Sequence, residues 1–159
     1  MPGRPHPAAL VALLLLLSSV AYAPAAHAAP RDGTATRYRP PVAAAVTDPF
    51  RAPSTPYGPG NRGLEYATRP GQPVGAIGPG TVVFAGAIAR RRYVTVLHRD
   101  GLRSSYSYLA SIEVVVGQVV AMGQRVGVAG ERLHLGVRRG DRYLDPATLF
   151  RRGRPRLVR

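Results

Sequence analysis

Short valine-rich runs alternate with glycine-containing turns from about residue 42 to residue 150, and no long stretch shows the 3.6-residue period of an amphipathic helix. Short apolar runs bounded by turn residues such as Gly78-Pro79-Gly80 and Asp100-Gly101 are typical of strands. The expected strands are 73–77, 81–87, 93–98, 102–109, 114–116, 125–129 and 133–137. The pattern therefore predicts an all-β domain, a compact antiparallel β-sheet sandwich or barrel.

The first 28 residues have the pattern of a secretory signal peptide. Arg4 precedes an uncharged run from Ala8 to Ala23, and Ala26-His27-Ala28 offers a cleavage site of small residues. The run is shorter than the roughly 20 apolar residues that span a bilayer, so no retained transmembrane anchor is expected. The sequence thus predicts a secreted protein of the extracytoplasmic cell envelope.

The remaining chain divides into three parts by composition. Residues 29–44 are rich in proline and arginine and are typical of an extended linker. Residues 45–150 carry the strand pattern and are expected to form the folded domain. Residues 151–159 contain five arginines and no acidic residue, which predicts a solvated basic tail.

Charge and composition exclude some kinds of site. The chain has 22 basic and 8 acidic residues, which give a net charge of +14. It has no cysteine, so disulfides, thiolate metal ligands and thiol nucleophiles are absent. Only His98 and His134 remain after residue 28. For an exported protein, a basic surface favours anionic wall polymers as partners, and no motif points to nucleic acid.

Several glycine-anchored segments then recur in a specific order. They are Asn61-Arg62-Gly63-Leu64-Glu65, two Gly-Gln-x-Val turns at residues 71–74 and 117–120, Tyr106-Ser107-Tyr108-Leu109, Arg132-Leu133-His134-Leu135, and Leu144-Asp145-Pro146. In this order the segments resemble the LytM or lysostaphin-type peptidase domain, a family of zinc endopeptidases that cut cross-linking peptides of peptidoglycan. The resemblance implies an antiparallel β domain with a substrate groove, and peptidoglycan or a cell-wall hydrolase as partner.

The resemblance also implies a set of site positions. The family's zinc ligands are a His and an Asp in a His-x-x-x-Asp segment and the second His of a His-x-His strand, which correspond to Asn61, Glu65 and His134. The family's two further histidines, which assist water and the transition state, correspond to Tyr108 and Arg132. Only His134 keeps the family's residue type. Strand alternation places Tyr106 on the same face as Tyr108, so Tyr106 is expected to line the binding groove.

These replacements change the expected chemistry. A catalytic zinc usually takes three imidazole, thiolate or carboxylate ligands, and Asn61 offers only a neutral amide oxygen. Arg132 stays protonated and can neither accept a proton nor bind zinc. We therefore expect no cofactor, or zinc if the chain is active, and a salt bridge from Arg132 to Glu65 in place of the metal.

Three hypotheses of function remain at the level of sequence. The first is a catalytically inactive domain that binds peptidoglycan or regulates a wall hydrolase. The second is an active zinc metalloendopeptidase with unusual ligation by Glu65, His134 and Asn61. The third, which has no motif behind it, is a nucleic-acid or membrane-surface binder driven by charge, whose binding would fall steeply with salt.

Three further features have structural explanations. His98 ends a strand and is expected to be satisfied by nearby backbone or side-chain groups. Asp145-Pro146 predicts a turn or the cap of a short helix. Arg90-Arg91-Arg92 opens a strand, either as a solvated edge that discourages aggregation or as a contact for wall polyanions.

Overall fold

The structure is a computed structural model that describes residues 38–55 and 58–151. Within these residues, nine strands and one short helix follow each other. They are β1 (Val46–Asp48), β2 (Gly63–Ala67), β3 (Pro73–Gly75), β4 (Gly80–Ile88), β5 (Arg91–His98), β6 (Leu102–Ile112), β7 (Val119–Val120), β8 (Arg125–Arg139), β9 (Arg142–Leu144) and α1 (Pro146–Arg151). The predicted all-β antiparallel fold class is confirmed.

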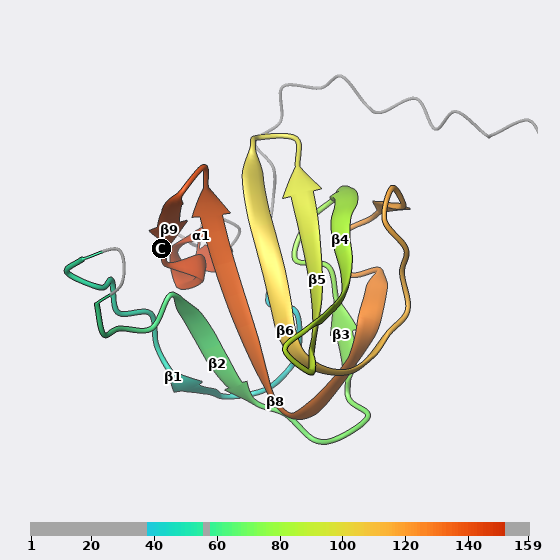
Figure 1. Cartoon of the computed structure of the whole chain (residues 1–159), viewed down its shortest axis with the longest axis horizontal. Helices are drawn as coiled ribbons and strands as arrows, with labels where there is room; N and C mark the ends of the chain where they lie inside the picture. Colours follow the sequence, from blue (N-terminus) through green and yellow to red (C-terminus); the bar gives the residue numbers. More distant parts are fainter. Residues whose placement is uncertain (1–37, 56–57, 152–159) are drawn as a thin grey trace, which may run out of the picture. The chain divides into compact units, whose positions relative to one another are not determined.

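All nine strands belong to one antiparallel sheet, with the order β1-β2-β8-β6-β5-β4-β7, and β3 and β9 each pair with β8 outside this path. Strand β8 is therefore the hub of the sheet. Figure 1 shows β8 bending in its middle, so that its first part lies beside β3 and its second part beside β2. Long-range pairing with four strands makes β8 the element that fixes the relative positions of β2 and β6.

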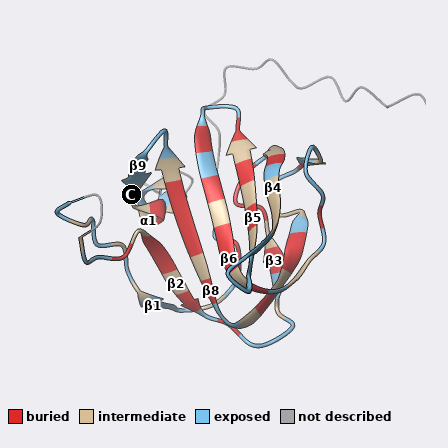
Figure 2. Ribbon diagram, in the orientation of Figure 1, coloured by how far each residue is buried: buried red, intermediate tan, exposed pale blue. Residues whose placement is uncertain are grey.

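The core lies along the inner face of this sheet, where β5, β6 and β8 carry most of the buried residues (Figure 2). On β8, Leu133, Leu135 and Val137 are fully buried, whereas Arg132, which precedes them, is exposed and His134, which lies between Leu133 and Leu135, is half-buried. This alternation is the one expected for a strand with a single face packed on the core. The predicted separation of Arg132 and His134 from the three apolar residues is thus confirmed.

Most of the predicted strands exist, with three differences. The segments 125–129 and 133–137 form one continuous strand, β8. Residues 114–116 form no strand: Val114 is buried, whereas Val115 and Val116 are exposed. The sequence pattern does not predict strands β1, β2, β7 and β9, because each has at most five residues and too few alternating positions to show a period of two.

Part of the segment predicted as a linker packs against the domain. Tyr38 and Val42 belong to the core, and the Arg39 amide donates a hydrogen bond to the carbonyl oxygen of Ile77 at 2.9 Å. Residues 38–44, which belong to the segment predicted as a linker, therefore pack as part of the domain. The predicted signal peptide of residues 1–28 and nearly all of the basic tail of residues 151–159 lie outside the described residues.

The C-terminal end of the described chain forms the short helix α1. Asp145 precedes it, and the Asp145 carboxylate accepts a hydrogen bond from the Ala147 amide at 2.9 Å. This is the cap predicted from the Asp-Pro pair. Within residues 38–55 and 58–151, no helix has the length and apolar character needed to cross a membrane.

His98 takes part in a buried hydrogen-bonded chain. Its Nδ1 lies 2.8 Å from the carbonyl oxygen of Pro79, and its Nε2 lies 2.8 Å from the Ser104 hydroxyl. The hydroxyls of Ser104 and Tyr106 share a hydrogen bond at 3.1 Å, and the Tyr106 hydroxyl accepts the Ile77 amide at 2.8 Å. Because a carbonyl oxygen only accepts, Nδ1 carries the ring proton. His98 is a satisfied core residue, as predicted.

This buried histidine predicts a pH-dependent stability. Burial lowers the pKa of His98, so below about pH 6.5 the unfolded chain takes up a proton that the folded chain does not. The free energy of unfolding should therefore be fully maintained above that pH. Below about pH 6.5, the free energy of unfolding should fall by at most about 1.4 kcal/mol per pH unit.

Urea unfolding between pH 7.5 and pH 5 checks this expectation. The variant His98→Gln is the control, because it removes the His98 imidazole and leaves every other ionisable group in place. We expect the slope between pH 6.5 and pH 5 to be shallower in the variant. Equal slopes in the two proteins would show that His98 is not the group responsible.

Candidate functional site

The centre of the candidate site is a hydrogen bond between Glu65 and His134. Glu65 on β2 is the register partner of His134 on β8, so both side chains leave the sheet at the same place. His134 Nδ1 lies 2.9 Å from Glu65 Oε1, and each side chain is about one-fifth exposed. The second carboxylate oxygen of Glu65, Oε2, is buried and has no hydrogen-bond partner among the described residues. One of the two carboxylate oxygens of Glu65 is thus hydrogen-bonded, and the pair is partly exposed to solvent.

Asn61 lies beside this pair, but its amide bonds the backbone. Its Nδ2 donates to the carbonyl oxygens of Asp48 and Pro49, both at 3.1 Å, and its Oδ1 accepts the Gly63 amide at 3.1 Å. Asp48 is also the register partner of Glu65. Asn61 and Glu65 are therefore both joined to β1 at Asp48, and the Asn61 amide has a structural role there.

Asp48 is a charged neighbour that the sequence analysis did not identify. Its carboxylate is paired with the Arg51 guanidinium, and the hydrogen bond from Arg51 is the main reason why the pKa of Asp48 lies below its ordinary value. The nearby His134 adds a smaller effect in the same direction. No spacing in the sequence could have shown this, since Asp48 reaches the site only through the pairing of β1 with β2.

Arg132 and Tyr108 form a second pair close to the first. The Arg132 guanidinium carbon lies 3.8 Å above the centre of the Tyr108 ring, and that of Arg91 lies 5.2 Å from the same centre. Both distances are in the range of cation–π interactions. The predicted salt bridge between Glu65 and Arg132 is therefore wrong: the Glu65 carboxylate bonds His134, and the Arg132 guanidinium stacks on Tyr108.

Tyr106 does not line the groove, which corrects another expectation. Its side chain is fully buried, and this burial raises the pKa of Tyr106 to about 12. Alternation along β6 fails here because Ser107 pairs with His134 and Leu109 with Ala129, so that one residue of β6 lies opposite four of β8 between these pairs. Between them, Tyr108 adopts a positive φ of 65°. This bulge turns Tyr108 to the opposite side from Tyr106.

The donor set does not fit the zinc ion that the resemblance implies. His134 and Glu65 supply two metal-binding side chains, and one nitrogen of His134 is already bonded to Glu65. The amide of Asn61 is fully engaged with the backbone. Nowhere in the described part of the chain do three His, Cys, Asp or Glu residues come close enough to hold a metal ion. Two ligands are one fewer than a catalytic zinc site requires.

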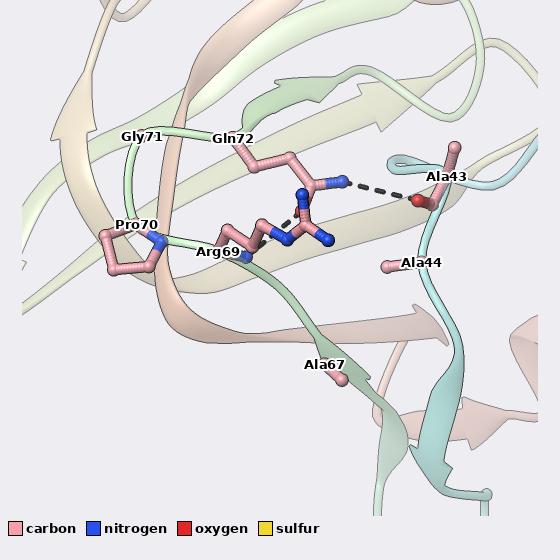
Figure 3. Close-up of a pocket in the computed structure, with 7 residues that line it drawn as sticks. All are labelled: Ala43, Ala44, Ala67, Arg69, Pro70, Gly71 and Gln72. Atoms are coloured by element: carbon pink, nitrogen blue, oxygen red, sulfur yellow. Dashed lines mark hydrogen bonds between the residues drawn. The ribbon is translucent and has the colours of Figure 1, made fainter.

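A wider concavity lies next to the C-terminal end of β2. It has a volume of about 610 Å³ and is lined by residues 43, 44, 67 and 69–72. In Figure 3 the Gln72 side chain reaches across it, where it donates to the Ala43 carbonyl oxygen at 3.4 Å and accepts the Arg69 amide at 3.2 Å. Arg69 is its one charged lining residue, so this concavity offers no acid, base or nucleophile among the described residues.

A second, smaller cavity adjoins Tyr108 and Arg132. Its volume is about 290 Å³, and its charged and aromatic lining residues are Arg90, Arg91, Arg92, Tyr108, Glu131 and Arg132. We call it the arginine pocket. The sequence places residues 90–92 at a strand edge, and their meeting with Tyr108 and Arg132 is visible only in the fold.

Comparison with known proteins supports the resemblance. The family model described as Peptidase family M23 matches residues 59–146. An uncharacterized protein of Mycobacterium tuberculosis is 40% identical over 126 residues, which cover 71% of this chain and 49% of that protein. The murein hydrolase activator NlpD of Salmonella typhimurium is 30% identical over 95 residues, which cover 55% of this chain and 25% of that protein.

A solved structure shares the fold. The crystal structure of a zinc-containing peptidase from Vibrio cholerae aligns with a TM-score of 0.58 and 25% sequence identity, covering 70% of this chain and 39% of that chain. The chain spans about half the length of the mycobacterial relatives that it matches.

Proposed function

Because the chain belongs to peptidase family M23, we propose that it is an exported cell-wall protein whose M23 domain binds wall material or a wall hydrolase without cleaving peptidoglycan. The fold and the pairing of Glu65 with His134 support a site of the family type. Fold alone does not supply chemistry, so the proposal rests on the residues in the site.

One observation carries the proposal: of the three family ligand positions, only Glu65 and His134 contribute metal-binding groups, and they are bonded to each other. The position of the third ligand holds Asn61, whose amide is satisfied by three backbone groups. Arg132 adds a permanent positive charge nearby and cannot act as a base. A site of this kind can hold a ligand but lacks the means to activate water.

Binding can serve the cell wall in two ways. The domain can attach to peptidoglycan itself, or it can regulate a separate wall hydrolase. The NlpD relative, which is named a murein hydrolase activator, supports the second form. Export rests on the signal-peptide pattern of residues 1–28, which lie outside the described part of the chain.

Incubation of the purified chain with peptidoglycan sacculi tests the proposal. We expect the protein to co-sediment with the sacculi, to release no soluble muropeptides, and to contain far less than one zinc ion per chain. A zinc-dependent M23 peptidase in the same assay is the positive control. If the chain bound neither sacculi nor a wall hydrolase, this result would contradict the binding function.

The alternative is an active zinc endopeptidase with unusual ligation, and one observation favours it. Glu65 Oε2 is buried without a hydrogen-bond partner in the described chain, beside His134, which leaves one carboxylate oxygen available to a cation. Stoichiometric zinc together with muropeptide release, both abolished by His134→Ala, would establish this alternative and overturn the inactive form.

A further inference from the structure

The arginine pocket concentrates positive charge without internal neutralisation. Four guanidinium groups against the single carboxylate of Glu131 give its lining a net charge of +3. The ion pairs of the described chain lie elsewhere: Asp48 with Arg51, Glu113 with Arg125, Glu65 with His134, and Asp141 with Arg138. Among the described residues, no carboxylate therefore pairs with an arginine of this pocket.

Tyr108 holds two of these arginines in place. With its guanidinium 3.8 Å above the ring centre, Arg132 stacks on the face of Tyr108, and Arg91 lies within 5.2 Å of the same centre. A stacked guanidinium keeps its N–H donors free at its edge, where they can form two parallel hydrogen bonds to a carboxylate or phosphate. Stacking also restricts the side chain before the ligand arrives, which lowers the entropic cost of binding.

The backbone is strained at the same place. Three non-glycine residues of the described chain have a positive φ: Ala89 at 46°, Arg90 at 68° and Tyr108 at 65°. Arg90 and Tyr108 line the pocket, and Ala89 precedes Arg90 in the two-residue turn between β4 and β5. Such conformations cost roughly 1–3 kcal/mol each and cluster at functional sites.

Other turns of the sheet avoid this cost. The turn from β5 to β6 has Gly101 at a φ of 81°, and the turn from β8 to β9 has Gly140 at 55°. Glycine is the residue that such turns favour. The turn between β4 and β5 instead carries Ala89 and Arg90, and Arg90 brings a guanidinium to the pocket. The strained backbone of this turn and the positive charge of Arg90 therefore lie at the same place.

We propose that the arginine pocket is an oxyanion-binding site, with the edge of the Arg132 guanidinium as its principal donor and Arg91 as its second. The ligand is a carboxylate or phosphate group. The molecule that carries this group is either a wall peptide, through its carboxylates, or an anionic wall polymer, through its phosphates. Only this assignment of the ligand to the wall rests on the proposed function. Because Arg132 lies two residues before His134 on β8, the pocket is an anchor at one side of the candidate groove.

Titration of the purified chain with inorganic phosphate and, separately, with acetate tests the pocket by NMR. We expect saturable shifts at Arg91, Tyr108 and Arg132, weakened about tenfold or more by Arg132→Gln, because a hydrogen bond to a charged group is lost. Arg132→Lys should bind with intermediate strength, since it keeps the charge but loses the fork. The ion that binds more tightly indicates the source.

Arg103→Gln is the matched control, because Arg103 is an exposed arginine on β6 outside the pocket. Thermal unfolding establishes that each variant is folded. The proposal would be overturned by an absence of saturable shifts with both ions, by an equal effect of Arg103→Gln and Arg132→Gln, or by full retention of binding in Arg132→Lys. Equal binding in Arg132→Lys would indicate general electrostatic attraction rather than a built site.

Sacculi with and without their phosphate polymers extend the test to the wall. Loss of ion binding in Arg132→Gln with unchanged binding to sacculi would overturn the role in the wall but leave the proposed function. Ion binding that depends on Arg132, in a chain that binds neither sacculi nor a hydrolase, would support the pocket and contradict the proposed function. The two proposals can therefore fail separately.

Discussion

Replacement of Asn61 by histidine and of Glu65 by aspartate is expected to create a zinc site with about one ion per chain. The Asn61 amide bonds the Asp48 carbonyl, and Glu65 is the register partner of both Asp48 and His134. The double variant supplies the third ligand that the natural chain lacks. We expect zinc to bind at least about 100-fold more tightly than in the unmodified chain.

Two physical changes act together in this variant. Asp is one methylene group shorter than Glu, which withdraws the carboxylate from His134 Nδ1 and frees both ring nitrogens. The Asn61→His change in turn replaces a neutral amide by an imidazole, a far better zinc ligand. The cost is the loss of the three backbone hydrogen bonds of Asn61, about 1–3 kcal/mol of stability for each buried group left unsatisfied.

Zinc titration by calorimetry, with thermal unfolding as a check of folding, measures the effect. The triple variant that adds His134→Ala is the control and should lose the gained affinity. Equally tight binding of about one zinc ion per chain by the natural chain and the double variant would show that Asn61 and Glu65 already serve as ligands. That result would favour the active endopeptidase over the inactive domain.

Leu133→Ala is expected to lower the free energy of unfolding by about 2–5 kcal/mol. Leu133 is fully buried on β8, between Arg132 and His134, and its truncation leaves a cavity that the surrounding strands cannot close completely. Because β8 pairs with β2, β3, β6 and β9, no neighbouring strand can move alone to fill the space.

Urea unfolding of both proteins at pH 7.5 gives this difference. Val119→Ala is the matched control, since Val119 is 68% exposed and its truncation should change stability by no more than about 0.5 kcal/mol. A loss below about 1 kcal/mol for Leu133→Ala would mean that Leu133 does not pack in the core. The faces of β8 would then be reversed, and the placement of Arg132 and His134 outside the core would be wrong.

The regular parts of the fold follow from the sequence. The pattern predicts strands β4, β5 and β6 within a few residues, because long alternating runs bounded by Gly and Asp-Gly turns have few other solutions. It does not predict the packed segment 38–44 or the strands β1, β2, β7 and β9. Each is too short to show a period and is held in place by pairing or packing with distant residues.

The sequence alone determined the chemical types available at the site: no cysteine, a histidine only at position 134, and an arginine that can never be a base at position 132. The tertiary structure decided which of these types meet. A strand pattern predicts the face of a residue only while the alternation is regular, and the bulge at Tyr108 breaks it, turning Tyr108 away from the buried Tyr106. The partner of Glu65 is the His134 imidazole, 69 residues away, whereas Arg132 stacks on Tyr108. Strand register sets these distances, and spacing along the chain does not.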